Sequence, residues 1–384
     1  MKIMLLGIGG VGTVVAKHIA GHKATTALTL ADMDTARAEA LARELPGKPK
    51  VDRVDAADGA ALAQSIKGHD LVLCAILPRF NKAVMAACLA QKIHYIDLAS
   101  DASFDELSVD ADWKKAGLLA VNGMGEDPGI SNVFARFAAD RLDEVEEIKV
   151  RDGEYSTSDA FPFACLFSTE TFIEEAVSPA RYFANGKYSE YPAFSNREVY
   201  PFPDPIGPLP IYNMSHEEVE SLPKYIGKGI KRCDFKLAVP DDARQHLEFL
   251  HAIGMTRLDK IRVRGGEVTP LSVLAAVLPQ PAEIGGKIKG AASVLVEVEG
   301  RKAGKRVRHI LWTGLTHDEA FRRQKVTATA FLTGTGAAAG VLAVATGQIK
   351  TRGAIPPEAL EPEPILAILS ELGLQIRKEE KPIA

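Results

Sequence analysis

The sequence predicts a chain of the α/β class, in which a doubly wound parallel sheet precedes a second domain of the α+β class. Two observations carry this prediction. Strand patterns alternate with helix patterns from residue 2 to residue 121, which is typical of a parallel sheet covered by helices. Beyond residue 145, strand patterns follow one another with few helices between them, as in a mostly antiparallel sheet. The 384 residues fit two or three domains of roughly 100 to 200 residues each.

The first strand and the first helix are joined by the most informative motif of the chain. A short apolar strand over residues 2–6 runs into the sequence GIGGVG, which has the spacing G-x-G-x-x-G, and a helical pattern follows. The first glycine permits a tight turn, the second lets the backbone approach a pyrophosphate, and the third allows close helix packing. The N–H groups at the start of the helix favour a bound phosphate. The predicted dinucleotide contacts of this Rossmann-type turn are Gly7, Gly9, Gly10, Val11 and Gly12.

An acidic residue follows the second predicted strand, residues 27–30. Asp32 stands twenty residues after Gly12, the place at which an acid binds the ribose hydroxyls of a dinucleotide. A carboxylate accepts a hydrogen bond from a 2′-hydroxyl and repels a 2′-phosphate, so the sequence favours NAD over NADP. Arg37 argues for NADP, unless it is only an exposed charge on the second helix. The alternative for the whole motif is a glycine-rich turn with Asp32 in a loop.

The later strands place further polar residues at the same edge of the sheet. Asp55 follows the third strand and is a candidate contact for the adenine amine, or else a helix cap. Residues 71–77 are apolar throughout, as in a parallel strand that is buried on both faces. Pro78 and Arg79 come next, where open α/β sheets bind ligands, and Arg79 is a candidate for a substrate carboxylate. Asp97 ends the following strand and is a candidate catalytic group.

The second domain is predicted from strand patterns and one long hairpin. Strands are expected over 147–151, 231–238 and 260–264, and hairpin strands over 292–298 and 306–313. An apolar helix of small residues over 326–346 indicates either tight helix packing or a ligand contact through Thr333. We expect this helix to return to the first domain. The predicted boundaries are 1–127 for dinucleotide binding, 128–325 for substrate binding and dimerisation, and 326–384 for the C-terminal helices.

The composition limits the partners and the compartment. Lys and Arg total 46 against 50 Asp and Glu, and the absence of a basic stripe argues against nucleic-acid binding. The four cysteines show no C-x-x-C spacing, so neither a zinc site nor a disulfide framework is expected. No run reaches the roughly 18 to 20 uninterrupted apolar residues of a membrane span. We expect a cytoplasmic homodimer with a small-molecule substrate and no metal, and with neither nucleic acid nor membrane as a partner.

Six segments together resemble the saccharopine dehydrogenase-like family, whose members include saccharopine reductases, lysine 6-dehydrogenases and carboxynorspermidine dehydrogenases. The resemblance covers essentially the whole chain. It implies an NAD(P)-linked reaction at a carbon–nitrogen bond of an amino acid or a polyamine. The matching segments are GIGGVG at 7–12, HYIDLAS at 94–100, GEDPGISN at 125–132, FSTETFIEEAVSPA at 167–180, HEEVESLPKYI at 216–226 and TGTGAAAGVLAVATGQI at 333–349.

Different parts of the chain resemble different members of the family. The N-terminal half, with the acid at Asp32, is most similar to the NAD-linked lysine 6-dehydrogenases. The segment 216–226, with residues 231–290, is closer to carboxynorspermidine-type enzymes, which favour NADPH. Cys74 stands where many relatives carry Asn in the motif of the fourth strand, and the resemblance implies a contact to the cofactor ribose there.

The implied chemistry requires a group that moves a proton at nitrogen. An amine gives up a hydride only after its nitrogen has lost a proton, because a lysine ammonium with a pKa near ~10.4 has no lone pair. A general base is therefore needed for oxidation, and a general acid for the reverse reduction. We predict oxidative deamination of the 6-amino group of L-lysine. The alternatives are imine reduction of the saccharopine or carboxynorspermidine type, and a dinucleotide-binding protein that acts by interaction without catalysis.

Polar residues within the family-like segments supply the remaining candidates. His216 and Glu217, with Glu218 beside them, place an imidazole that titrates near neutrality among carboxylates. The alternative is a polar surface loop with one hydrogen-bonded histidine. Asp127 is a further catalytic candidate or, alternatively, a helix cap. The predicted catalytic residues are His216, Glu217, Asp97 and Asp127, and the predicted substrate contacts are Arg79, Glu126, Ser168, Thr169 and Thr333.

Overall fold

Two structural units divide the chain in the computed structural model, which describes residues 1–101 and 103–383. The first unit holds residues 1–137 and 331–376, and the second holds 138–330 and the segment from 377 onward. This division differs from the predicted one in three places, of which the smallest is that residues 326–330 belong to the second unit. The helix that begins at Ile130 stays with the first unit as far as Phe137, and the segment after residue 376 belongs to the second unit.

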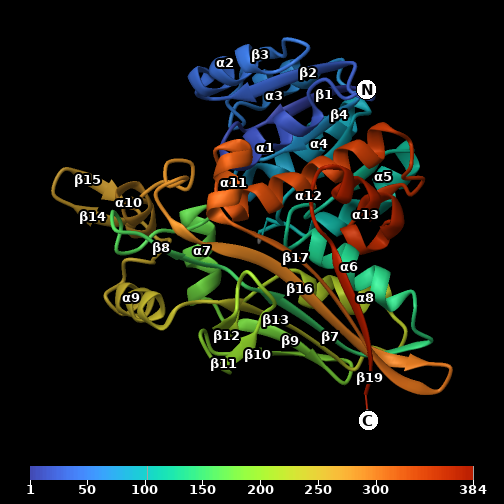
Figure 1. The fold of residues 1–384 in the computed structure, drawn as a ribbon. Coiled ribbons are helices and arrows are strands. Elements are labelled where there is room, and N and C mark those ends of the chain that lie inside the picture. The colour runs from blue at the N-terminus through green and yellow to red at the C-terminus, as the bar shows by residue number, and fades with distance from the viewer. Residues whose placement is uncertain (102, 384) are drawn as a thin grey trace. The chain divides into compact units, whose positions relative to one another are not determined.

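The first unit is built on a seven-stranded sheet in which every neighbouring pair is parallel (Figure 1). Its strand order is β18-β6-β5-β4-β1-β2-β3, so the order reverses between β1 and β4, where such sheets bind ligands. The predicted doubly wound parallel sheet is confirmed. The strands are β1 (Lys2–Leu6), β2 (Ala27–Asp32), β3 (Lys50–Arg53), β4 (Leu71–Cys74), β5 (His94–Asp97), β6 (Leu119–Val121) and β18 (Gly353–Ile355).

Helices connect these strands, and their start signals are read directly from the sequence. Asp34 and Asp58 cap the second and third helices, because each carboxylate accepts a backbone N–H from the first turn. The helices of this unit are α1 (Gly10–Ile19), α2 (Thr35–Glu44), α3 (Gly59–Ile66), α4 (Asn81–Gln91), α5 (Asp110–Ala116), α6 (Ile130–Ala139), α12 (Ala328–Ala345) and α13 (Pro362–Glu371), with 3-10 turns at Pro78–Phe80, Glu106–Val109 and Pro357–Ala359.

Helix α12 packs within the first unit through glycines. A Cβ on Gly334 would overlap the side chain of Val14, and one on Gly336 would overlap the carbonyl of Gly125. These close approaches show that the small residues serve tight helix packing, which is one of the two interpretations offered for this pattern. Among the described helices, α12 is the one that is long and apolar enough to cross a membrane. However, 83% of this 18-residue helix is buried inside the protein. A core helix passes the same test, so this is weak support for a membrane span.

The second unit contains a ten-stranded, largely antiparallel sheet, which confirms the predicted α+β class. Its main path is β10-β9-β13-β7-β16-β17-β19, in which β13 and β7 are parallel. The strands are β7 (Glu144–Asp152), β8 (Tyr155–Thr157), β9 (Ala180–Ala184), β10 (Lys187–Tyr191), β11 (Glu198–Pro201), β12 (Pro208–Asn213), β13 (Arg232–Ala238), β16 (Lys289–Lys302), β17 (Lys305–Thr316) and β19 (Arg377–Pro382).

The predicted hairpin is present, and its strands are longer than expected. Lys302 pairs with Lys305, so Ala303 and Gly304 alone form the turn. Both have positive φ, +49° and +75°, as a type I′ turn requires. Strand β19 adds to the free edge of β17, although every residue of β19 is exposed.

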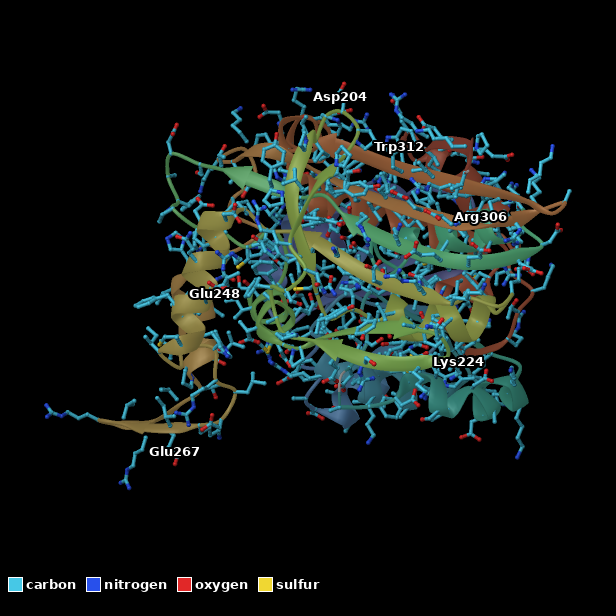
Figure 2. All side chains as sticks on the ribbon, turned by 90° about the horizontal axis from the view of Figure 1, so that it is seen from below. Asp204, Lys224, Glu248, Glu267, Arg306 and Trp312 are labelled. Carbon is cyan, nitrogen blue, oxygen red and sulfur yellow. The ribbon has the colours of Figure 1, made fainter. Side chains whose placement is uncertain are left out.

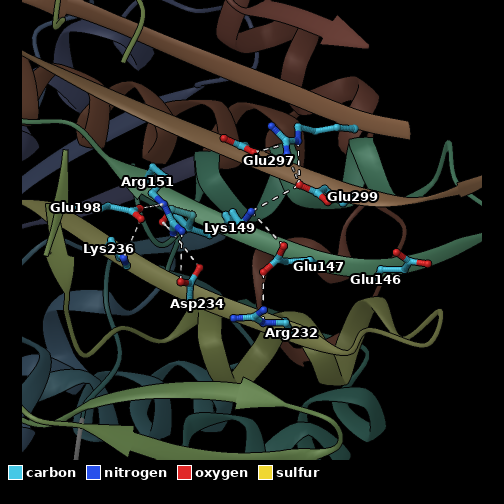
Figure 3. A network of polar contacts seen from close by, with 12 residues as sticks. Glu146, Glu147, Lys149, Arg151, Glu198, Arg232, Asp234, Lys236, Glu297 and Glu299 are labelled. Carbon is cyan, nitrogen blue, oxygen red and sulfur yellow. Dashed lines mark hydrogen bonds and ion pairs between the residues drawn. The ribbon is translucent and has the colours of Figure 1, made fainter. Parts of the chain in front are cut away.

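One face of this sheet carries acidic and basic side chains in alternation (Figure 3). Arg151 on β7 is 3% exposed and lies between Asp234, at 2.9 Å, and Glu198, at 3.7 Å. Lys149 lies 3.6 Å from Glu299 of the neighbouring strand β16. The buried guanidinium of Arg151 is thus compensated by carboxylates from both sides, as a buried charge requires.

Five helices and a separate hairpin complete the described part of the second unit. The β14–β15 hairpin pairs with no other described strand, and Figure 2 labels Glu267 within it and Glu248 on the neighbouring helix α9. Strand β14 coincides closely with the strand that was predicted over 260–264. These elements are α7 (Thr169–Val177), α8 (Glu218–Ile226), α9 (Asp241–Ala252), α10 (Pro270–Val277), β14 (Ile261–Val263) and β15 (Gly266–Val268), followed by α11 (His317–Gln324).

Candidate active site

The glycine-rich turn has the geometry that a dinucleotide phosphate needs. Gly7 has φ +101°, and a Cβ there would overlap the carbonyl of Ala75. A Cβ on Gly12 would overlap the carbonyl of Gly7, so the third glycine brings α1 against the strand. By contrast, nothing lies within 4 Å of a Cβ built on Gly9. The second glycine therefore leaves open space beside the N-terminus of α1, and these residues fit a bound pyrophosphate.

Asp32 ends β2 next to this turn. Its Oδ2 accepts the N–H of Ile8 at 2.7 Å, and its Oδ1 accepts the N–H of Asp34 at 3.0 Å. The carboxylate thus holds the glycine turn against β2, and each oxygen keeps a second lone pair for a ribose hydroxyl. Arg37 is an exposed side chain on α2, in agreement with the simpler of its two interpretations.

The other predicted cofactor contacts differ in their exposure. Asp55 is exposed and accepts the N–H of Ala57 at 2.9 Å, which leaves the predicted adenine contact untested. Pro78 begins the 3-10 turn after β4 and is partly buried. Cys74 is a correction: it shares a face of β4 with Val72, and both lie in the hydrophobic core. Burial raises the pKa of its thiol to about 12, so a buried neutral thiol stands where a ribose contact was expected.

Asp97 lies in a buried polar network of the first unit, where sequence reasoning had placed a catalytic group. Asp97 and Glu106 are 1% and 3% exposed. The amide of Asn81 donates to both, at 3.2 and 2.8 Å, and the amide of Asn122 donates to both, at 3.1 and 2.9 Å. The N–H of Gly123 donates to Asp97 at 2.6 Å. The network ties the ends of β5 and β6 to α4. The contacts of Asp97 therefore hold these elements in position.

Burial raises the pKa of Asp97 well above its ordinary range, and the neighbouring charge of Glu106 raises it further. The side-chain amides of Asn81 and Asn122 that bridge the two carboxyl groups are neutral donors. Sequence reasoning missed Glu106, Asn81 and Asn122, because the three come from separate elements. The one local signal was that Asn122 directly follows residue 121, where the alternating strand and helix patterns of the first domain end.

The predicted substrate contacts in the first unit are spread over separate elements. Arg79 is exposed, and its guanidinium carbon lies 5.2 Å from the centre of the Phe80 ring, so this side chain stacks on the neighbouring aromatic residue. Glu126 is buried and Asp127 is partly buried within the turn that precedes α6. Thr333 is partly buried on α12. Substrate binding by Arg79, Glu126 and Thr333, and catalysis by Asp127, stay predictions.

The predicted substrate contacts in the second unit lie at the start of α7. Ser168 is the N-cap of this helix: its hydroxyl accepts the N–H of Thr171 at 3.4 Å and the hydroxyl of Thr171 at 2.9 Å. Thr169 is buried. Helix capping therefore accounts for Ser168 without any substrate.

The predicted cluster at 216–218 is brought together at the start of α8. His216 donates from Nδ1 to Oε2 of Glu218, which is fully buried, and Glu217 Oε2 lies 3.6 Å from the same nitrogen. The imidazole stacks on Phe235 of β13, with ring centres 3.9 Å apart and planes 6° apart. The His216 side chain is only 9% exposed. Because Nδ1 is engaged by Glu218, Nε2 is the second ring nitrogen that can carry a proton.

The electrostatics of this cluster favour a protonated imidazole. Burial by itself lowers the pKa of His216, but the carboxylates of Glu218, Glu217 and Glu175 outweigh it and raise the pKa to about 10. The metal-binding atoms of His216, Glu217 and Glu218 do lie within 4.8 Å of one another. An imidazolium, however, has no lone pair to offer a metal, so the arrangement is better suited to proton transfer.

Two further carboxyl groups of the second unit, the half-buried Glu175 and the buried Glu154, were missed from the sequence. Burial raises the pKa of Glu175 on α7 to about 8, with His216 opposing the shift and Glu217 and Glu218 adding to it. Glu154 follows β7, accepts the hydroxyl of Thr329 at 2.9 Å and is 5% exposed. Burial raises the pKa of Glu154 to about 7. Nothing local in the sequence distinguishes these two acids from surface carboxylates.

The comparisons show an NAD(P)-dependent dehydrogenase that acts on CH–NH₂ or CH–NH donors, and the glycine-rich turn of the first unit fits the dinucleotide of that class. The chain belongs to the saccharopine dehydrogenase family. Residues 3–121 match the saccharopine dehydrogenase NADP binding domain, and residues 125–374 match the saccharopine dehydrogenase C-terminal domain. The family expected from the sequence is therefore confirmed.

Two curated relatives cover nearly the whole chain. Carboxyaminopropylagmatine dehydrogenase of Synechocystis sp. is 32% identical over 97% of this chain and 96% of its own length. Carboxynorspermidine synthase of Vibrio cholerae is 29% identical over 97% and 96%. Among solved structures, apo saccharopine dehydrogenase (L-Glu forming) of Saccharomyces cerevisiae has a TM-score of 0.74 at 17% identity, with both chains fully covered. This last likeness concerns the fold alone.

Proposed function

We propose that the protein catalyses the NAD(P)H-dependent reduction of an imine to the secondary amine of a carboxylated polyamine. The observation that carries the proposal is the buried imidazole of His216, which is hydrogen-bonded through Nδ1 to Glu218 and so keeps Nε2 as its second proton-bearing atom. The names of the two curated relatives support the substrate class, because both denote carboxylated derivatives of polyamines or of agmatine.

The protonation state of His216 favours reduction over oxidation. Imine carbon accepts a hydride readily only when the imine nitrogen is protonated. His216 donates that proton from Nε2, and Glu218 stabilises the imidazolium before the transfer. When bound, the reduced dinucleotide supplies the hydride. Nitrogen gains the proton, carbon gains the hydride, and the imidazole regains its proton from solvent.

Oxidative deamination of lysine, the function first predicted, requires the opposite starting state. His216 would have to enter the reaction as the neutral base, but with a pKa of about 10 it is protonated at neutral pH. The imine-reducing alternative therefore has the stronger support. For the cofactor we propose NAD, because the carboxylate of Asp32 repels a 2′-phosphate, although the matching family domain is described as NADP binding.

The test is a hydride-transfer assay, followed as the absorbance of reduced nicotinamide in the oxidative direction at alkaline pH. Carboxyaminopropylagmatine, carboxynorspermidine, saccharopine and L-lysine are each offered with NAD⁺ and with NADP⁺. We expect turnover of a carboxylated polyamine and a preference for NAD⁺. Turnover of lysine alone would overturn the proposal in favour of the lysine reaction, and a preference for NADP⁺ would overturn the role of Asp32.

A further inference from the structure

Among the described residues of the first unit, Met33 is the exposed large apolar side chain, with an exposed fraction of 62%. Single exposed apolar residues are common on protein surfaces, so exposure alone says little. The place of Met33 is what distinguishes it: the residue directly follows Asp32, whose carboxylate lies where the ribose hydroxyls of a dinucleotide bind. The part of a dinucleotide next to that ribose is the adenine, a flat aromatic ring that can cover an apolar side chain.

Hydrogen bonds hold the backbone on both sides of Met33. Oδ1 of Asp32 accepts the N–H of Asp34 at 3.0 Å, and Asp34 in turn caps α2 by accepting the N–H of Ala36. The carbonyl of Asp32 accepts the N–H of Val54 at 3.1 Å, so the ends of β2 and β3 lie side by side. The bend between β2 and α2, which are both labelled in Figure 1, is therefore fixed, and it exposes the thioether beside the ribose-binding carboxylate.

We propose that the side chain of Met33 packs against the adenine ring of the bound dinucleotide, and that oxidation of its sulfur weakens cofactor binding. Adjacent Cα atoms lie about 3.8 Å apart, so a ribose held by Asp32 keeps its base within reach of the next side chain. A thioether is polarisable and makes favourable contacts with aromatic rings, whereas a sulfoxide is polar and loses water when a ring covers it. The contact belongs to the dinucleotide site and is independent of the substrate that is reduced.

The oxidation of Met33 requires a peroxide and no other reactant. A hydroperoxide transfers one oxygen atom to the sulfur, so that the sulfur–oxygen bond forms as the O–O bond breaks. The thioether loses two electrons and becomes a sulfoxide. The peroxide is reduced to an alcohol, or to water where it is hydrogen peroxide. Methionine sulfoxide reductases reverse the modification, so the change in cofactor affinity is reversible as well.

The other sulfur atoms of the chain are less accessible to a peroxide than that of Met33. All four cysteines are buried. Burial raises the pKa of the thiols of Cys74 and Cys165 to about 12, which keeps them protonated and slow to react. A mild oxidant therefore modifies Met33 first. The remaining methionines are either buried, as are Met4, Met85, Met124 and Met214, or partly buried, as are Met1 and Met255.

The first test measures the binding of ADP-ribose, which contains the adenine and lacks the nicotinamide, by calorimetry. Met33→Ser removes the apolar surface and should weaken binding about 3- to 10-fold, whereas Met33→Leu retains it and should stay within about twofold of the wild type. The matched control is Leu258→Ser, at a residue of the second unit that is 58% exposed, and it should leave binding unchanged. Equal affinities of Met33→Ser and the wild type would overturn the contact with adenine.

The second test treats the wild-type protein with limiting hydrogen peroxide and locates the added oxygen by peptide mass spectrometry. We expect oxidation first at Met33, slowed about threefold or more by saturating ADP-ribose, and a loss of NADH affinity of about 3- to 10-fold, followed by nicotinamide fluorescence. Methionine sulfoxide reductase should restore the affinity, and peroxide-treated Met33→Leu should keep it. Earlier oxidation of another sulfur, no protection by ADP-ribose, or unchanged NADH affinity after oxidation of Met33 would each overturn the proposal.

Discussion

Buried carboxyl groups occur in both units of the molecule, but their surroundings differ in kind. Asp97 and Glu106 of the first unit accept hydrogen bonds from the side-chain amides of Asn81 and Asn122, which carry no charge and do not titrate. Glu218 of the second unit is bound to an imidazole that titrates. Neutral amide donors can only hold the strand ends together, whereas an imidazolium can deliver a proton. The partner of a buried acid, more than its burial, thus separates a structural site from a chemical one.

The largest expected effect follows from removal of the proton donor in the second unit. His216→Gln keeps a polar side chain of similar reach but cannot donate a proton of suitable pKa, so kcat for imine reduction should fall about 10²- to 10⁴-fold. Steady-state kinetics, with dinucleotide binding followed separately by nicotinamide fluorescence, provide the measurement. His246→Gln, at an exposed histidine on α9, is the control. A loss of less than fivefold would show that the proton comes from another group.

A second, smaller effect concerns the pH range of the reaction. Glu218→Gln removes the charge that most strongly raises the pKa of His216, so that pKa should fall from about 10 by about 1 to 3 units. The alkaline limb of the kcat profile should move down with it, which lowers turnover at pH 9 about tenfold or more and leaves turnover at pH 6 nearly unchanged. NMR titration of the imidazole checks the assignment. An unchanged alkaline limb would mean that His216 is not the group that titrates.

The same pKa shifts fix the sign of the pH dependence of stability. The pKa of His216 is raised from 6.5 to about 10, so its contribution to folding stability is complete below about pH 6.5 and is lost as pH rises towards 10. The pKa of Glu175 is also raised, from 4.5 to about 8, so ionisation of Glu175 costs stability over that range. The melting temperature should therefore fall from pH 6 to pH 10, and it should fall less in Glu175→Gln. A melting temperature that rises over this interval would contradict both assignments.

In the first unit the same kind of substitution should affect stability and leave the chemistry intact. Asn81→Ala removes hydrogen bonds to Asp97, Glu106 and the carbonyl of Ala99 and leaves buried acceptors without donors. We expect a loss of about 1 to 3 kcal/mol in the free energy of unfolding. Urea denaturation measures the loss, and kcat per folded enzyme should change less than threefold. A large fall in kcat at unchanged stability would return Asp97 to the list of catalytic candidates.

The sequence predicted elements well where the determining signal is local. Strand β1 has the predicted bounds, because its apolar run ends at Gly7, and β5 ends at Asp97 as predicted. Strand β19 escaped prediction: its residues are all exposed, and only the free edge of β17 makes it a strand. The last strand and the short strands between 155 and 213 depend on pairing with distant partners, which single-sequence patterns do not record.

The candidate site follows the same rule. His216 and Glu218 are two residues apart at the start of a helix, so their contact was visible in the sequence. Glu175 is distant from them along the chain and comes close only through the packing of α7 in the second unit. Asp97 was visible as the end of a strand, but its role depends on Glu106, which approaches through a separate 3-10 turn. Residue type and strand ends located the polar groups, and only tertiary structure identified their partners.

The smallest expected effect tests the corrected place of Cys74. Its thiol lies in the core beside Val72 and faces the amide oxygen of Asn81 at 3.6 Å, within the same buried region as Asp97. Cys74→Ala should therefore lower the free energy of unfolding by about 1 kcal/mol, as a small buried deletion does. The dissociation constant for the dinucleotide should stay within twofold, since no cofactor contact is lost. If dinucleotide binding weakened tenfold or more at unchanged stability, position 74 would contact the cofactor ribose. The buried residues around Asp97 would then serve cofactor binding as well as structure.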